Sequence, residues 1–311
     1  MKLLKTPFQS LLDFGMNSFY NILYQFYLRC DIMTVYETEE IQKKRDYLVV
    51  KSNELVLQTR YQFSMIEQKT IAYICSMIRP SVKNQSGYVL DYEFDILEYA
   101  HICGIEKNGK LYDDVKRALK GLRDKSMWLT LPNGSETVVG WLDRVTTDKG
   151  NGKIQIRIDD RLAPYLFELQ SRYLSYGLKN ILCMKSQFSI RLYEMFRAYL
   201  GLQSACWDNR ARMTRINTPV PYEWIVDIDE LKRKLMVDDI KSYKRDNSVF
   251  KRKVLDPAHI EINEFSDISF DFEMLKKGRS FYAVKFTIIY KNLIERSKVD
   301  VKTSVLLDKP K

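Results

Sequence analysis

Histidine is the rarest titratable residue in this 311-residue chain, which has only two, His101 and His259. They lie far apart, and no His-x-His pair, metal-ligand cluster or paired-carboxylate pattern accompanies them. Enzymes that nick DNA through a tyrosine need such a histidine pair to hold their metal ion. The sequence therefore predicts a protein that is not an enzyme, with no catalytic residues and no metal site.

Cysteine is also sparse. The five cysteines are odd in number, scattered and never spaced as Cys-x-x-Cys. This usage indicates reduced thiols, most of them core residues, in a cytoplasmic protein.

Long apolar runs are missing as well. The aromatic-rich stretch FGMNSFYNILYQFYL, residues 14–28, is interrupted by Asn, Ser and Gln, and no small-residue cleavage site follows it. We therefore predict neither a membrane span nor a signal peptide. Residues 1–40 are expected to form an N-terminal extension, either a docked amphipathic helix or an unstructured segment, and Met33 is an alternative start.

Glycine-rich phosphate loops are absent apart from one partial match. GIEKNGKL, residues 104–111, satisfies G-x-x-x-x-G-K, but Leu111 replaces the Ser or Thr that would hold magnesium. A helix rather than a strand is predicted before it. We interpret the segment as a turn between helices, and no nucleotide or other cofactor is predicted.

Positive charge is what the chain has in excess. Its 50 Lys and Arg residues against 40 Asp and Glu give a net charge of +10. A basic balance of this kind favours a polyanionic partner, either nucleic acid or an anionic membrane surface.

The first half of the chain has the pattern of three helices followed by a β-hairpin. Apolar periodicity predicts helices over residues 63–78, 94–104 and 111–125. Ser64 with Glu67 and Asp95 with Glu98 form capping boxes at the first two. MWLTLPNGSETVVGWLDRV (127–145) then predicts a hairpin, and the alternating KIQIRI predicts a further strand.

The second half repeats this order. Helical patterns recur over residues 188–200, 226–237 and 242–255. The D-I-x-E cap at Asp95 recurs at Asp227, and an alternating hairpin follows over residues 268–290. Three helices with a hairpin form the winged-helix variant of the helix-turn-helix. The predicted fold is therefore α+β, with two tandem winged-helix domains related by internal duplication.

The predicted domain boundaries follow from this repeat. Residues 41–160 form the N-terminal winged helix, and residues 161–300 form the C-terminal one. Residues 301–311 are a tail.

The third helix of the second half concentrates the charge. From Lys241 to Lys253 there are six basic residues and only Asp246 as an acid, so this segment has a net charge of +5. Treated as one helix from Lys241 to Leu255, it has an inner face made of Ile240, Tyr243, Phe250 and Val254. Pro257 is expected to end this helix, and a strand is predicted to begin at Ile260 to Asn263.

DNA binding is the interpretation that this charge favours over a merely solvated helix face. In the second module the candidate DNA-binding residues are Lys241, Lys244, Arg245, Ser248, Lys251 and Arg252, with Lys276, Lys277 and Arg279 at the wing tip. In the first module they are Lys116, Arg117, Lys120 and Arg123. Arg245 and Arg252 are candidates for bidentate pairing with guanine edges.

Three signatures resemble a known family. They are KSNEL, S-x-x-x-I-R-L-Y-E ending at Glu194, and F-K-R-x-V-L-D-P-A-x-x-E-I-N beginning at Phe250. They lie in order within residues 45–295, and together they are similar to the plasmid replication initiators of the Rep3 superfamily, the RepE-like and RepB-like proteins. The segment 206–224 and the first 40 residues have no counterpart in this resemblance.

The resemblance implies an iteron-binding protein. Its partners would be double-stranded DNA at origin iterons and at an operator, a second copy of the chain in a monomer–dimer equilibrium, and the host initiator and replicative helicase. Dimers would repress their own gene and help control plasmid copy number. The resemblance implies that the N-terminal winged helix serves dimerisation and DNA binding and that the C-terminal one is the main DNA-recognition domain. The groove contacts of the C-terminal one would be made by Lys244, Arg245, Ser248, Lys251 and Arg252. A winged-helix transcriptional repressor without initiator activity is the alternative, and a membrane-associated basic protein is a weaker one.

Overall fold

The structure is a computed structural model. It describes residues 39–78, 83–84, 87–105, 109–130, 134–148, 150–169, 173–205 and 220–308. The chain divides into two compact units, residues 1–44 and 45–311, and the fold below is that of the second unit. The predictions for residues 1–38 and for most of 206–224 lie outside the described residues.

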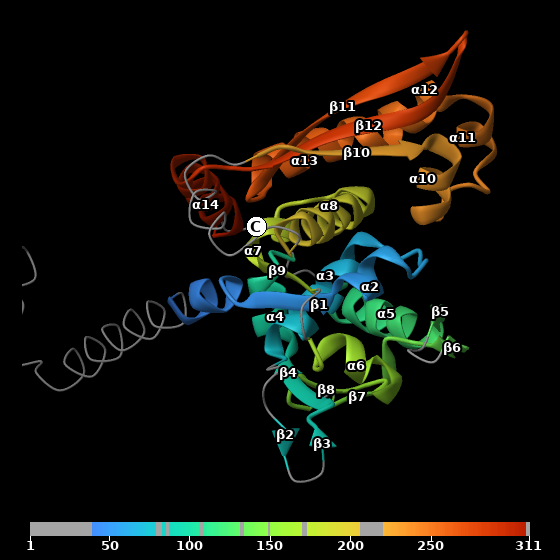
Figure 1. Cartoon of the computed structure of the whole chain (residues 1–311). Helices are drawn as coiled ribbons and strands as arrows, with labels where there is room; N and C mark the ends of the chain where they lie inside the picture. The colour runs from blue at the N-terminus through green and yellow to red at the C-terminus, as the bar shows by residue number, and fades with distance from the viewer. Residues whose placement is uncertain are drawn as a thin grey trace, which may run out of the picture. The chain divides into compact units, whose positions relative to one another are not determined.

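The first winged helix begins with α3 (Met65–Met77), which Ser64 and Glu67 start with the predicted capping box. Strand β4 (Asp91–Asp95) leads into α4 (Ile96–Ile102), where the Asp95 side chain accepts hydrogen bonds from two backbone N–H groups. Helix α5 (Leu111–Asp124) follows, and its apolar side is buried through Leu111, Val115, Ala118, Leu119 and Leu122. Three predicted helices are thus confirmed (Figure 1).

The sheet of this module differs from the prediction in one respect. Strands β5 (Met127–Thr130) and β6 (Glu136–Val139) form the expected hairpin. The prediction that the hairpin strand continues to Val145 is wrong, because the chain leaves the hairpin at Gly140. A Cβ at Gly140 would lie 2.8 Å from the Arg123 carbonyl oxygen, so glycine lets the backbone pass close to α5 there. Residues beyond it form β7 (Leu142–Thr147), which pairs with β8 (Lys153–Ile158).

The second winged helix repeats this plan. Helix α8 (Gln187–Ala205) precedes β10 (Tyr222–Asp227) and α10 (Ile228–Lys234), and Asp227 caps α10 as Asp95 caps α4. Strands β11 (Ile268–Lys277) and β12 (Ser280–Tyr290) form the wing. The sheet orders are β4-β8-β7 and β10-β12-β11, so in both modules the strand before the second helix pairs with the last strand. The predicted duplication is visible in this topology.

Further elements connect the modules. Strand β1 (Leu48–Ser52) runs into α2 (Asn53–Leu57) and pairs with β9 (Tyr173–Gly177), which is distant in sequence. A short turn of helix at Asp160–Leu162, α6 (Ala163–Leu166) and α7 (Lys179–Leu182) lie between β8 and α8. The two-residue strands β2 (Lys83–Asn84) and β3 (Gly87–Tyr88) form a small separate hairpin. The division between domains at residue 160 stays a prediction.

The last helix, α14 (Leu293–Leu307), begins with a second capping box, made by Asn292 and Glu295. Its final turn contacts the first module, since the Arg45 guanidinium lies 2.5 Å from the Asp308 carboxylate and donates to the carbonyls of His101 and Ile102. Part of the predicted tail is therefore an ordered, packed helix.

The cores of the two modules are rich in aromatic residues. In the second module Phe196, Phe270 and Phe286 are all buried, and the ring of Phe196 lies 4.8 and 5.1 Å from the other two. Cys75 and Cys103 are buried free thiols, as predicted for core cysteines. Within the described ranges, no helix combines the length and apolar character needed to cross a bilayer.

Candidate nucleic-acid interface

The basic segment is not one helix. It begins as α11 (Lys241–Arg245), breaks at Asp246 and restarts as α12 (Asn247–Phe250). Asp246 has extended backbone angles, and its carboxylate accepts a hydrogen bond of 2.7 Å from the Ser248 N–H. This hydrogen bond, helped by the nearby Arg252, lowers the pKa of Asp246. The predicted continuous helix is wrong because an aspartate favours capping a new helix over continuing one.

Pro257 does not end the helix that Asn247 begins. A π-helical turn over Lys251–Leu255 follows α12 directly, and α13 (Asp256–Phe265) follows that turn. The Asp256 N–H donates to the Lys251 carbonyl five residues back, so the wider turn comes just before the proline, whose ring would clash with a carbonyl in a regular α-helix. We name residues 247–265 the reading helix.

The strand predicted at Ile260 to Asn263 is therefore also wrong, because these residues belong to α13. Ile262 is fully buried and Ile260 is mostly exposed. This is expected on a helix, where residues two positions apart point to nearly opposite sides. An alternation of four residues is too short to separate the two periodicities.

Several signature residues have structural roles. The Asn263 side chain donates to the Phe270 carbonyl and accepts from the Phe270 N–H. The Glu261 carboxylate accepts from the N–H groups of Lys185 and Ser186, just before α8. These contacts fix the end of the reading helix against the strand and helix beside it.

The predicted inner face holds the reading helix to its core. Phe250 and Val254 are fully buried, and Ala258 and Ile262 extend the same stripe. Tyr243 is half-buried, and its ring lies 5.9 Å from that of Phe250.

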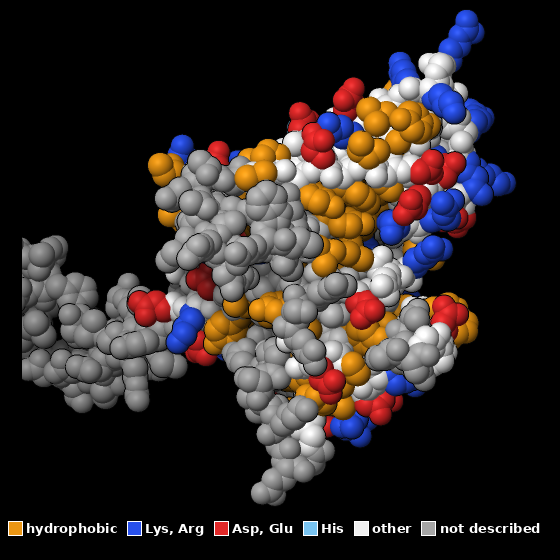
Figure 2. Space-filling model, viewed as in Figure 1, with side chains coloured by type: hydrophobic (Ala, Val, Ile, Leu, Met, Phe, Trp, Pro, Cys, Tyr) orange, Lys and Arg blue, Asp and Glu red, His pale blue; other side chains and the backbone are white. Residues whose placement is uncertain are grey.

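The outer face of the segment carries exposed cations that form no ion pairs with described residues, although Arg252 lies near enough to Asp246 to affect its pKa. Five predicted residues are exposed there: Lys241, Lys244, Arg245, Ser248 and Arg252. Lys253, which the sequence prediction passed over, is exposed beside Arg252. None of these cations forms an ion pair with any residue that the structure describes. Figure 2 shows Lys and Arg side chains gathered at this end of the second module, around α10, α11, α12 and the hairpin tip.

Lys251 differs from the rest of this set. Its ammonium lies 2.6 Å from the Asp256 carboxylate and 5.3 Å from the ring centroid of Phe272 on β11. This lysine is half-buried and already paired, so it is less available to DNA than the exposed cations beside it.

The wing tip places three more cations near the reading helix. Gly278 has a positive φ of 65°, which the tight turn between β11 and β12 requires. Lys276, Lys277 and Arg279 are exposed around it, and the Lys276 ammonium lies 4.9 Å from the Phe281 ring.

The predicted cations of the first module are paired along their own helix. Arg117 lies 3.0 Å from Asp114, Arg123 lies 3.3 Å from Asp124, and Lys120 also pairs with Asp124. Lys116 lies over the Tyr112 ring at 5.7 Å. Among the described residues, only Asp114 and Asp124 pair with these four cations, so the two carboxylates offset about half of their charge.

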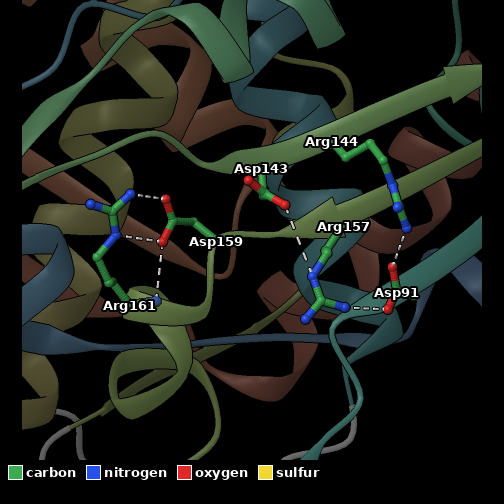
Figure 3. Close-up of polar contacts among 6 residues, drawn as sticks. All are labelled: Asp91, Asp143, Arg144, Arg157, Asp159 and Arg161. Atoms are coloured by element: carbon green, nitrogen blue, oxygen red, sulfur yellow. Dashed lines mark hydrogen bonds and ion pairs between the residues drawn. The ribbon is translucent and has the colours of Figure 1, made fainter.

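In and beside the sheet of the first module, arginines are likewise paired with aspartates (Figure 3). Asp91 on β4 accepts from Arg157 at 2.5 Å and from Arg144 at 3.3 Å. Arg161 pairs with Asp159 at 2.5 Å. Among the predicted DNA-binding cations, those without an ion pair to a described residue therefore lie mainly in the second module.

The remaining sequence predictions concern chemistry. Gly104 has a positive φ of 62° after the end of α4, which supports the turn between helices, although residues 106–108 lie outside the description. His259 stacks edge-on against Phe270 and lies 3.7 Å from Asp271. Among the described residues, no three His, Cys, Asp or Glu side chains are grouped to hold a metal ion.

Comparison with known proteins identifies relatives that are similar in sequence. A 27.6 kDa protein of Escherichia coli is 22% identical over 246 residues, which cover 76% of this chain and 93% of the relative. A PI protein of Escherichia coli is 24% identical over 203 residues, covering 60% of this chain and 62% of the relative.

One solved structure shares the fold. The crystal structure of a Pi initiator protein in complex with iteron DNA matches with a TM-score of 0.61 at 20% identity, covering 79% of this chain and 98% of that one.

Family models cover both modules. Residues 48–197 match the initiator replication protein WH1 domain, Rep3_N, and residues 227–288 match the initiator Rep protein WH2 domain, Rep3_C. Together these segments cover more than half of the chain and contain both winged helices. The chain belongs to the Rep3 family of replication initiator proteins.

Proposed function

We propose that this protein initiates plasmid replication by binding direct repeats, the iterons, at the plasmid origin. The observation that carries the proposal is the set of exposed cations without ion pairs to described residues around the reading helix and the wing, in a chain of the Rep3 family. The Pi initiator with the same fold was crystallised on iteron DNA.

The cations divide into two roles. Lysines such as Lys244 and Lys277 neutralise phosphates and provide affinity that falls with salt, whereas Arg245 and Arg252 read guanine edges in the major groove. Arg245 lies just before the reading helix and Arg252 lies in its π turn, so the part that enters the groove is the N-terminal part of the reading helix together with Arg245. The wing contacts the backbone beside it.

The first module has a different part in this proposal. Its helix α5 adds weaker DNA contacts through Lys116, Arg117, Lys120 and Arg123, because these cations are already paired or packed. The same module mediates a dimer that represses its own gene. The monomer opens the origin and recruits the host initiator and the replicative helicase. The protein acts in the bacterial cytoplasm on plasmid DNA and performs no covalent chemistry.

The decisive experiment is plasmid maintenance. The gene with its flanking DNA is placed on a plasmid that cannot otherwise replicate, and transformants are counted in a suitable host. The proposal expects stable plasmids and requires several direct repeats of about two helical turns each beside an A·T-rich stretch. Loss of the plasmid, with binding only to a single inverted repeat, would instead support a repressor.

A further inference from the structure

A buried lysine lies directly behind the reading helix. Lys232 is on α10, the helix before the reading helix, and only 3% of its side chain is exposed. Its ammonium lies 2.7 Å from the Asn247 side-chain oxygen and 3.4 Å from the Asp229 carboxylate. It also lies 5.8 Å from the ring centroid of Phe250. The ammonium is therefore held beside the first turn of the reading helix.

Asn247 extends this contact to the wing. Because the ammonium can only donate, the amide must face it with its oxygen, and the NH₂ group points the other way. That NH₂ group donates to the Phe281 carbonyl of β12 at 3.3 Å. One ammonium and one amide thus join α10, the reading helix and the wing, and we name this pair the Lys232–Asn247 clamp.

The clamp ends close to the cations of the wing tip. Phe281 pairs with Lys276 across the hairpin, and its ring is the one that the Lys276 ammonium approaches. The carbonyl that accepts from Asn247 therefore belongs to Phe281, whose ring contacts the Lys276 ammonium. A shift of β12 relative to the reading helix would move the wing tip with it.

Stability alone does not account for a lysine at this place. A buried ammonium loses its hydration, and an apolar side chain of similar length would fill the same space without that cost. An ammonium instead fixes the direction of the Asn247 amide, which an apolar side chain cannot do. A buried polar group of this kind specifies one arrangement of the elements around it.

We propose that Lys232 and Asn247 are positioning residues for DNA recognition, and that the clamp holds the wing at the distance from the reading helix that lets both bind one DNA site. Lys232 itself is buried and reaches no DNA. The inference rests on the DNA binding proposed above, and it adds the coupling between the groove contact and the wing contact.

The test measures the affinity for direct-repeat DNA at several salt concentrations. The slope of log affinity against log salt concentration counts phosphate contacts, because each contact contributes about 0.9 to it. The parent protein is compared with Lys232→Met and with the wing variant K276A/K277A/R279A. The wing variant is expected to reduce the slope by about 2 to 3. Lys232→Met is expected to reduce it by a similar amount, although the residue that it replaces is buried. Combining the two should cost no more than either alone.

Two further variants keep the test decisive. Asn247→Ala removes both clamp contacts without a change of charge and should repeat the effect of Lys232→Met. Lys234→Met is the matched control, because this lysine of the same helix lies 3.6 Å from Glu230 and takes no part in the clamp. Thermal unfolding and circular dichroism identify any variant that fails to fold, and Asn247→Ala then decides the question.

The outcomes separate this inference from the proposed function. If Lys232→Met and Asn247→Ala bind with the slope of the parent while the wing variant loses contacts, the clamp does not position the wing and the inference is overturned. If the parent shows no preference for direct repeats, the proposed function fails instead.

Discussion

The Lys51 ammonium lies 2.5 Å from Glu194 Oε1, and both side chains are only 3% exposed. The Tyr176 hydroxyl donates to the same oxygen at 2.5 Å. Burial has the largest single effect and opposes the charged form of Lys51, but the Glu194 carboxylate, with smaller contributions from Cys75 and Tyr61, leaves the pKa of Lys51 above its ordinary value. The pair joins β1 to α8, so two of the three family signatures, KSNEL and the one ending at Glu194, meet at one buried contact.

Replacing Lys51 with Met should lower the free energy of unfolding by about 3 to 5 kcal/mol, since it leaves the Glu194 carboxylate buried without its counter-charge. Denaturant unfolding of the purified protein measures this. Adding Glu194→Gln to the Lys51→Met variant removes the unpaired buried charge and should restore part of the lost free energy of unfolding. An unchanged denaturation midpoint in Lys51→Met would show that the pair is not buried in solution.

Arg245→Ala combined with Arg252→Ala should abolish repeat-specific binding. Each arginine that reads a guanine contributes about 1 to 3 kcal/mol of discrimination, so the double variant should bind repeats little better than random DNA. Mobility shifts with specific and scrambled duplexes measure the ratio. Arg117→Ala with Arg123→Ala is the matched control in the first module and should change the ratio far less. Equal effects from both pairs would refute the role of Arg245 and Arg252 in reading guanine edges.

Lys291 should make stability rise with pH above neutrality. Its ammonium donates to the carbonyls of Asn263 and Ser266, and burial lowers its pKa from 10.5 to about 8. Between these values the unfolded chain holds a proton that the folded chain has released. The contribution of Lys291 is therefore least favourable below pH 8 and improves as the pH rises toward 10.5.

Urea unfolding at pH 7.5 and 9.5 tests this, and Lys291→Met should flatten the difference. The measurement stays below pH 10, because buried tyrosines such as Tyr193 have raised pKa values and begin to oppose stability there. A parent protein whose stability falls between the two pH values, with Lys291→Met behaving alike, would contradict the prediction.

Gly121→Ala should destabilise the first module by about 1 to 3 kcal/mol. A Cβ at this position of α5 would lie 1.9 Å from Glu67 Oε1. That carboxylate is buried and cannot easily move, because it accepts hydrogen bonds from the Ser64 N–H and the Lys125 ammonium, each at 2.6 Å. Gly201→Ala in α8 is the control, since its nearest new contact is an ordinary 3.6 Å and alanine favours a helix. Thermal unfolding should separate the two variants in opposite directions.

Most of the architecture could be predicted from the sequence because it depends on local signals. The caps at Ser64, Asp95 and Asp227, and the alternation in β11 and β12, each specify an element from a few neighbouring residues. The core stripe of the reading helix through Phe250 and Val254 was predicted for the same reason.

The rest depends on contacts between distant residues. The partners of Lys251 and the acids that pair with the α5 cations decide which charges remain available, and spacing alone does not show this. The clamp at Lys232 was missed because a lysine in an amphipathic helix looks like a surface residue. The path of the chain through Pro257 was missed because the π turn is defined by a hydrogen bond, not by composition.

The π turn in the reading helix also explains the spacing of its buried residues. Phe250, Val254, Ala258 and Ile262 follow one another at every fourth position. In a regular α-helix of 3.6 residues per turn, such a row would drift by about 40° at each step and leave the core. The underwound π turn over residues 251–255 offsets part of this drift. Deleting one residue within 251–255 would therefore convert the π turn into an ordinary α turn and leave the later side chains of the reading helix facing the core.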